Sequence, residues 1–147
     1  MKGSIEQELR NNGFVLMHTV GISMRPMLHE RREQNLIRPP QGLPRANDVV
    51  LYRRQNGQYV LHRIIRSRGG VLYIRGDNCY LCEKVPADRI IGVLRGFYRK
   101  DRYIDCEKAL LYRGYVWLWR LVYPIRYLCH HIHRGLWRLR HRKWKQR

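Results

Sequence analysis

The segment that decides the fold is Val49-Val50-Leu51-Tyr52-Arg53-Arg54-Gln55-Asn56-Gly57-Gln58-Tyr59-Val60-Leu61-His62-Arg63-Ile64-Ile65. Two runs rich in β-branched and aromatic residues, Val49–Arg53 and Tyr59–Ile65, flank the triplet Gln55-Asn56-Gly57. An Asn-Gly pair between two such runs is a strong hairpin signal, because both residues tolerate the positive φ that a tight turn requires. The segment therefore predicts two antiparallel strands joined by a short turn.

Other short hydrophobic runs extend this pattern on both sides of the hairpin. The further predicted strands are Gly13–Val20, Gln34–Arg38, Val71–Arg75 and Ile90–Tyr98. Pro39–Pro44 and Arg68-Gly69-Gly70 supply the turn chemistry that separates them. Short strands with turn signals between them predict a mainly β, antiparallel body, and no long helical period precedes residue 107.

The distribution of charge predicts a second part of the chain. The 147 residues include 30 Lys and Arg against 11 Asp and Glu, for a formal net charge of +19. No acidic residue follows Glu107, so every charged side chain among the last forty residues is a Lys or Arg. We therefore expect a catalytic body over residues 1–106 and a separate basic element over residues 107–147. A charge of this size predicts attraction to an anionic partner, either a phospholipid surface or nucleic acid.

The basic element is expected to be helical. Glu107–Tyr123 and Ile125–Trp144 have helical character, with a break or kink at Pro124. The second segment interleaves the apolar residues Ile125, Leu128, Ile132, Leu136, Trp137 and Leu139 with arginines. Such a mixture favours an interfacial helix, whose apolar groups enter the acyl boundary while its cationic side chains reach the head groups. Packing on its own domain and a solvated cationic tail are the alternatives.

No segment of the sequence resembles a signal peptide or a clear transmembrane helix. Met1–Gly13 is polar and lacks an apolar stretch. Ala109–Ile125 is the most apolar segment, but Arg113, Arg120 and Pro124 interrupt it. We expect a peripheral membrane protein on the cytoplasmic side, attached through residues 107–147.

The four cysteines leave one question open. Cys79-Tyr80-Leu81-Cys82 has the spacing of a metal or redox site, but no second CxxC accompanies it, and Cys106 and Cys129 stand apart. We favour reduced cysteines over a metal site, and we expect no cofactor.

Three short sequence motifs could together supply a nucleophile, a base and an acid, which make a serine hydroxyl reactive. Ser23 lies in the loop Val20–Leu28, His62 lies in the second hairpin strand, and Asp77 follows Gly76 after a strand. Strand alternation places His62 between two aliphatic neighbours on one face, so burial and nearby positive charge should lower its pKa and leave it able to accept a proton. Either Asp77 or Glu83 could orient the imidazole. The Ser23 amide could stabilise an oxyanion, with Gly21 allowing close approach of the backbone.

These sequence motifs resemble those of a known family. Gly21-Ile22-Ser23-Met24-Arg25-Pro26-Met27 resembles the nucleophile box of type I signal peptidases and of the related self-cleaving repressor peptidases. Asn47–Tyr52 resembles the strand that follows in this family, and Ile91-Gly92-Val93 resembles its closing strand. Leu61–Ile65 and Arg75–Asn78 resemble the branch that carries histidine where housekeeping enzymes carry lysine.

The resemblance covers roughly residues 14–97 and implies a signal-peptidase-like antiparallel β-fold and a serine endopeptidase. The resemblance implies that Ser23 is the nucleophile, that His62 is the general base, and that Asp77 and Glu83 are the acids. Gly21, Met24 and Pro26 then shape the nucleophile loop. The chain departs from the pattern at Asn47, where glycine is usual and where we expect a left-handed conformation.

The substrate remains open at this stage. Members that process secreted proteins usually have an N-terminal membrane anchor, whereas about twenty residues precede Ser23 here, so the basic tail is expected to replace the anchor. We expect a precursor protein or peptide as substrate. The alternatives are a repressor-type self-cleaving peptidase and a non-catalytic module that binds nucleic acid or a membrane.

Overall fold

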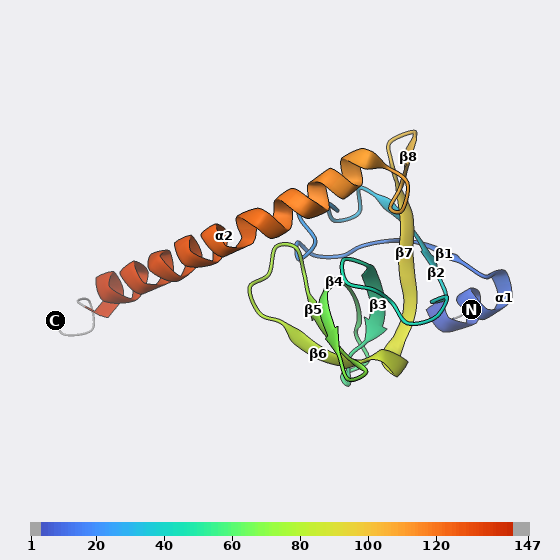
Figure 1. The fold of residues 1–147 in the computed structure, drawn as a ribbon, viewed down its shortest axis with the longest axis horizontal. Coiled ribbons are helices and arrows are strands. Elements are labelled where there is room, and N and C mark those ends of the chain that lie inside the picture. Colours follow the sequence, from blue (N-terminus) through green and yellow to red (C-terminus); the bar gives the residue numbers. More distant parts are fainter. Residues whose placement is uncertain (1–3, 143–147) are drawn as a thin grey trace. The chain divides into compact units, whose positions relative to one another are not determined.

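The computed structural model describes the backbone of residues 4–142 and the side chains of residues 4–138. The chain divides into two compact units, Met1–Arg113 and Gly114–Arg147. The first unit contains a short N-terminal helix and an antiparallel sheet (Figure 1). The second consists of most of helix α2 (Leu110–Arg142). A mainly antiparallel β fold with a C-terminal helix, as predicted from the sequence, is confirmed.

A single sheet of eight strands forms the body of the first unit, and it curls into a half-barrel (Figure 1). Seven strands follow the order β1-β2-β7-β3-β4-β5-β6, β8 pairs with β7, and every pairing is antiparallel. The strands are β1 (Val15–His18), β2 (Gln34–Arg38), β3 (Val49–Arg53), β4 (Tyr59–Arg68), β5 (Val71–Arg75), β6 (Glu83–Pro86), β7 (Ile90–Arg99) and β8 (Arg102–Asp105).

The predicted hairpin is confirmed, although its second strand continues to Arg68 beyond the predicted Ile65. β3 pairs with β4 from Val49 opposite Arg63 to Arg53 opposite Tyr59. The turn closes where the Arg54 amide donates to the Gln58 carbonyl at 2.9 Å, and Gly57 takes a φ of 84°. Both faces of β3 and of the first half of β4 are buried, so this hairpin occupies the middle of the sheet.

The hydrophobic core includes the face of the central strands that carries His62. Val60 and Ile64 flank His62 on that face of β4, as strand alternation predicts, and both belong to the core. The core cluster comprises Val50, Tyr52, Val60, Ile64, Leu72, Ile74, Val85, Ile90 and Val93. Burial of these side chains supplies the main stabilisation of the fold and surrounds the histidine with apolar atoms.

Three short elements, helix α1 (Ile5–Asn12), β6 and β8, were not predicted from the sequence. Helix α1 begins at a capping box in which Ser4 and Gln7 exchange side-chain hydrogen bonds, and it ends at Gly13 with a φ of 72°. β6 and β8 have four residues each and are rich in charge, so they lack an apolar pattern.

Helix α2 differs from the prediction at two points. It begins at Leu110 rather than Glu107, because the Asp105 carboxylate accepts the amides of Glu107 and Lys108 in a preceding turn. Of the predicted break or kink at Pro124, the break does not occur, since the helix continues through that residue. A proline inside a helix removes its own hydrogen bond and crowds the carbonyl four residues earlier, here that of Arg120, yet the helix stays continuous. Residues 143 and 144 of the predicted helix lie outside the described part. No described helix is both long enough and apolar enough to cross a membrane.

Candidate active site

Ser23 lies in the loop between β1 and β2, and the Gly-Asp-Asn turn after β5 holds its backbone. The Asn78 amide donates to the Ser23 carbonyl at 2.7 Å, and the Asn78 side chain donates to the Ile22 carbonyl at 3.3 Å. Ser23 itself is half-buried. Two motifs separated by about fifty residues are therefore in direct contact through backbone hydrogen bonds, as a shared site requires.

Gly76 is the point where the Ser23 loop and His62 meet. A Cβ at position 76 would lie 2.6 Å from the Ser23 carbonyl oxygen and 3.1 Å from Nε2 of His62. Real Cβ atoms do not approach backbone oxygen so closely, so a glycine is required here. Gly21, which we expected to let the backbone approach an oxyanion closely, has different surroundings in the structure, and that expectation stays a prediction. A Cβ at position 21 would meet no described atom, and Gly21 instead provides a φ of 93°.

The two ring nitrogens of His62 face different surroundings. Nε2 lies against Gly76 beside the Ser23 backbone. Nδ1 lies 3.4 Å from the Tyr52 hydroxyl and 3.7 Å from Oε1 of Glu83. A tautomer with the proton on Nδ1 has acceptors on that side and leaves Nε2 free to accept a proton near Ser23.

Burial sets the protonation state of His62. The pKa of this histidine is lowered from 6.5, mainly because burial disfavours the imidazolium, and the charge of Arg54 lowers it further against the opposing effects of Glu83 and Asp77. The direction agrees with the sequence prediction. Because the folded pKa lies below the unfolded one, the unfolded chain binds more protons, and this residue reduces folding stability as the pH falls below about 6.5. At neutral pH the imidazole is uncharged and can act as a base.

Glu83 is the carboxylate beside His62, and Arg54 fixes it in place. Nε of Arg54 donates to Oε2 of Glu83 at 2.9 Å, and the second guanidinium nitrogen bonds the other carboxylate oxygen. These hydrogen bonds, with one from Tyr52, lower the pKa of Glu83. Burial raises the pKa of Tyr52, so its hydroxyl keeps its proton at neutral pH. An ionised carboxylate thus backs Nδ1 of the histidine.

Asp77 forms a buried ion pair with Arg63 on β4. The two Asp77 oxygens each accept a hydrogen bond from the guanidinium at 2.8 Å, and both side chains are almost fully buried. Arg63 also donates to the Asn47 carbonyl at 2.8 Å and to the Tyr112 hydroxyl at 3.1 Å, and it contacts Sδ of Met27 at 2.9 Å. Burial opposes the charge on Arg63, but its bonds to Asp77 raise its pKa. The pair therefore joins the turn after β5, the Asn47 turn and the nucleophile loop.

Met24 and Pro26 lie in the same loop as Ser23, Val20–Leu28, and have different surroundings. Met24 is buried, and its carbonyl accepts the Leu28 amide at 2.9 Å. Pro26 is exposed and follows a cis peptide bond. Asn47 takes a φ of 81°, which confirms the left-handed conformation expected at this position.

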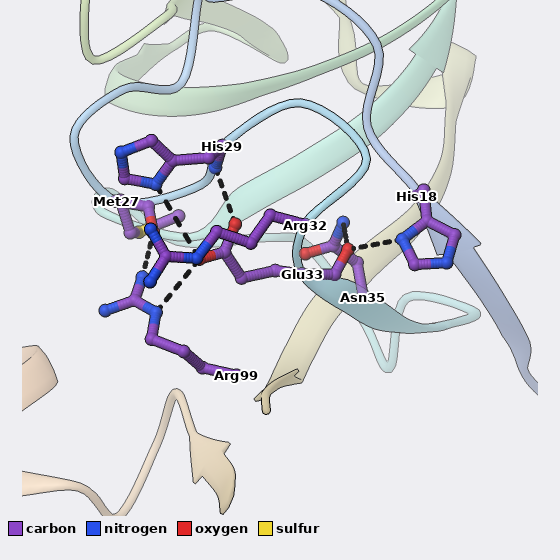
Figure 2. A network of polar contacts seen from close by, with 7 residues as sticks. All are labelled: His18, Met27, His29, Arg32, Glu33, Asn35 and Arg99. Carbon is purple, nitrogen blue, oxygen red and sulfur yellow. Dashed lines mark hydrogen bonds and ion pairs between the residues drawn. The ribbon is translucent and has the colours of Figure 1, made fainter. Parts of the chain in front are cut away.

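A second polar network, centred on Glu33, was missed by the sequence analysis (Figure 2). Glu33 is completely buried, accepts the His29 amide at 2.6 Å and pairs with Arg99 of β7 at 2.9 Å. Arg99 also donates to the Met27 carbonyl at 2.5 Å. These bonds tie the end of the nucleophile loop to the sheet (Figure 2). The sequence signal is weak, because Glu33 follows Arg31 and Arg32 and looks like part of a charged surface.

The CxxC cysteines lie at the edge of the site. Cys79 is half-buried, and its Sγ would lie 2.9 Å from a Cβ at position 76, whereas Cys82 is exposed. Burial, with the charge of Glu83, raises the pKa of the Cys79 thiol. Among the described residues, no three His, Cys, Asp or Glu side chains are grouped in a way that could hold a metal ion.

Comparisons with known proteins give no identification. No family model matches the chain, and no curated protein matches it.

The charges around His62 predict opposite pH shifts for two variants. Arg54→Met should raise the pKa of His62, because the Arg54 charge lowers it, whereas Glu83→Gln should lower it further. We expect the acid limb of the rate at which Ser23 reacts with a fluorophosphonate to move to higher pH in Arg54→Met and to lower pH in Glu83→Gln. Arg53→Met, an exposed neighbour, is the matched control and should leave the limb in place. Shifts of both variants in one direction would contradict this electrostatic arrangement.

Proposed function

We propose that this protein is a serine endopeptidase with a signal-peptidase-like fold that cleaves a precursor protein or peptide. Ser23 is the nucleophile and His62 the general base. The observation that carries the proposal is the contact at Gly76, where Nε2 of a neutral His62 and the Ser23 backbone lie against the same glycine. The carboxylate of Glu83 on the opposite side of the ring completes an arrangement suited to activating a hydroxyl.

In the first half of the reaction, Oγ of Ser23 attacks the carbonyl carbon of the scissile peptide bond and Nε2 of His62 takes its proton. The imidazolium that forms is stabilised by the ionised Glu83 beside Nδ1. The backbone N–H of Ser23 donates no hydrogen bond within the described residues, so it is available to the oxyanion of the tetrahedral intermediate. Collapse of this intermediate breaks the C–N bond, and the imidazolium gives its proton to the leaving amine.

The second half repeats these roles with water. His62 takes a proton from a water molecule, which attacks the acyl-enzyme ester, and returns the proton to Oγ of Ser23 as the ester breaks. Asp77 takes no part in the proton transfers of this proposal and has a positioning role. Its bidentate bond to Arg63 holds the turn that contains Gly76 and Asn78, so it positions the site through the backbone.

A fluorophosphonate probe tests the proposal without knowledge of the substrate. The wild-type chain contains three serines, Ser4, Ser23 and Ser67. We expect mass spectrometry of the treated protein to find the adduct on Ser23 and not on the other two, which serve as internal controls. The reason is that the Ser23 backbone and Nε2 of the neutral His62 lie against the same glycine. No adduct, or an adduct spread over all three serines, would remove Ser23 as an activated nucleophile and would favour a binding module.

A further inference from the structure

Helix α2 carries a continuous apolar stripe on its surface. Seven side chains of the second unit have the spacing of one helix face and are each between 51% and 68% exposed. We call them the apolar stripe: Trp117, Leu118, Leu121, Ile125, Leu128, Ile132 and Leu136. The stripe begins before Pro124 and includes four of the apolar residues named from the sequence after it: Ile125, Leu128, Ile132 and Leu136. Trp137 lies on another side of the helix, and the side chain of Leu139 lies outside the described part.

The charges along this helix are all of one sign. Residues 108–147 contain 11 Lys and Arg and no Asp or Glu. At 100° per residue, Arg120, Arg134 and Arg138 follow one flank of the apolar stripe, and all three are exposed. Arg126 instead lies with its guanidinium 4.0 Å from the centre of the Trp119 ring. An apolar face bordered by long cationic side chains is the arrangement of a helix that lies in a bilayer interface.

We infer that the apolar stripe docks on the surface of an anionic phospholipid bilayer, with the helix lying in the plane of the interface. Charge complementarity selects this occupant. A second copy of the chain would bring two helices of the same positive sign together, and like charges at short range oppose association. Nucleic acid would satisfy the arginines but would leave the stripe in water. An anionic membrane can bind both the apolar stripe and the arginines, because acyl chains contact the leucines and lipid phosphate groups pair with the arginines. This inference does not depend on the peptidase proposal.

Co-sedimentation of the full chain with lipid vesicles tests this surface. We expect binding to phosphatidylcholine vesicles that contain phosphatidylserine, and much weaker binding to phosphatidylcholine alone or at high salt. Leu121→Glu combined with Leu128→Glu should reduce the bound fraction by at least about tenfold, because two carboxylates would enter the acyl boundary.

A charge-matched control separates the stripe from net charge. Tyr127 and His133 are exposed and lie off the apolar stripe. The Tyr127→Glu and His133→Glu double variant should therefore retain most of the binding. Circular dichroism shows whether each variant keeps its helix, and reaction of Ser23 with the fluorophosphonate shows whether the first unit is intact. Equal binding by the two double variants, no binding of the wild type to the anionic vesicles, or a stable dimer in sedimentation that hides the stripe would each overturn the inference.

Discussion

The His62→Ala variant is expected to react with a fluorophosphonate about 10²–10⁴-fold more slowly than the wild type, the usual range for loss of a general base. The physical reason is that Ser23 has an ordinary hydroxyl, which needs a proton acceptor within reach at the moment of attack. His62 is suited to that role, because burial keeps it neutral and its Nε2 lies against the residue that the Ser23 backbone also contacts. The measurement is the second-order rate constant of labelling at neutral pH.

The same experiment includes a test for joint action. Ser23→Ala should abolish labelling, and the Ser23→Ala and His62→Ala double variant should be no different from Ser23→Ala alone, since residues that act as a unit do not add. His133→Ala replaces an exposed histidine of α2 and should react like the wild type. A near-normal rate in His62→Ala would eliminate the Ser23–His62 pair as the catalytic device.

Asp77→Asn is expected to lower the free energy of unfolding by about 3–5 kcal/mol, the usual cost of breaking a buried ion pair on one side. The change leaves the Arg63 guanidinium charged and buried, with two of its charge-assisted hydrogen bonds weakened. Since Arg63 also bonds the Asn47 carbonyl and contacts Met27, three loops lose part of their common support. Urea denaturation followed by circular dichroism measures the loss.

Two further variants show whether the pairing is the cause. Asp88→Asn removes an exposed carboxylate and should change the stability little. Combining Asp77→Asn with Arg63→Met should recover part of the lost stability, because no unpaired guanidinium then remains in the interior. If Asp77→Asn were as stable as the wild type but unreactive, Asp77 would be acting directly on His62, and the positioning role assigned to it here would be wrong.

The parts of the fold with strong local signals could be predicted from the sequence. β2, β3 and β5 have the predicted bounds, because apolar runs end there at glycine, proline or asparagine turns. Charged four-residue strands such as β8 could not be found, since pairing with a neighbour and not their own pattern makes them strands. The continuation of α2 through Pro124 was missed for a related reason, because local propensity is one contribution among many in a long helix.

The candidate site was predictable as a set of residues but not as a geometry. Ser23 and His62 lie in recognisable sequence motifs. The alternation of side chains along β4 correctly predicted that His62 is buried. The choice between Asp77 and Glu83 required the direction of each carboxylate, which spacing along the chain does not contain. Glu33 and Arg99 are 66 residues apart, so only the folded sheet reveals that one buried carboxylate holds the end of the nucleophile loop.

Gly76 also has a consequence for the time at which the proposed active site can form. During synthesis, Ser23 leaves the ribosome long before the segments that carry His62, Gly76 and Glu83. Gly76 directly follows β5, and Glu83 begins β6, which pairs with β5. A nascent chain that ends before Glu83 therefore carries the serine without its complete surroundings. The order of the segments along the chain therefore delays the assembly of the proposed site until residues up to Glu83 have been synthesised.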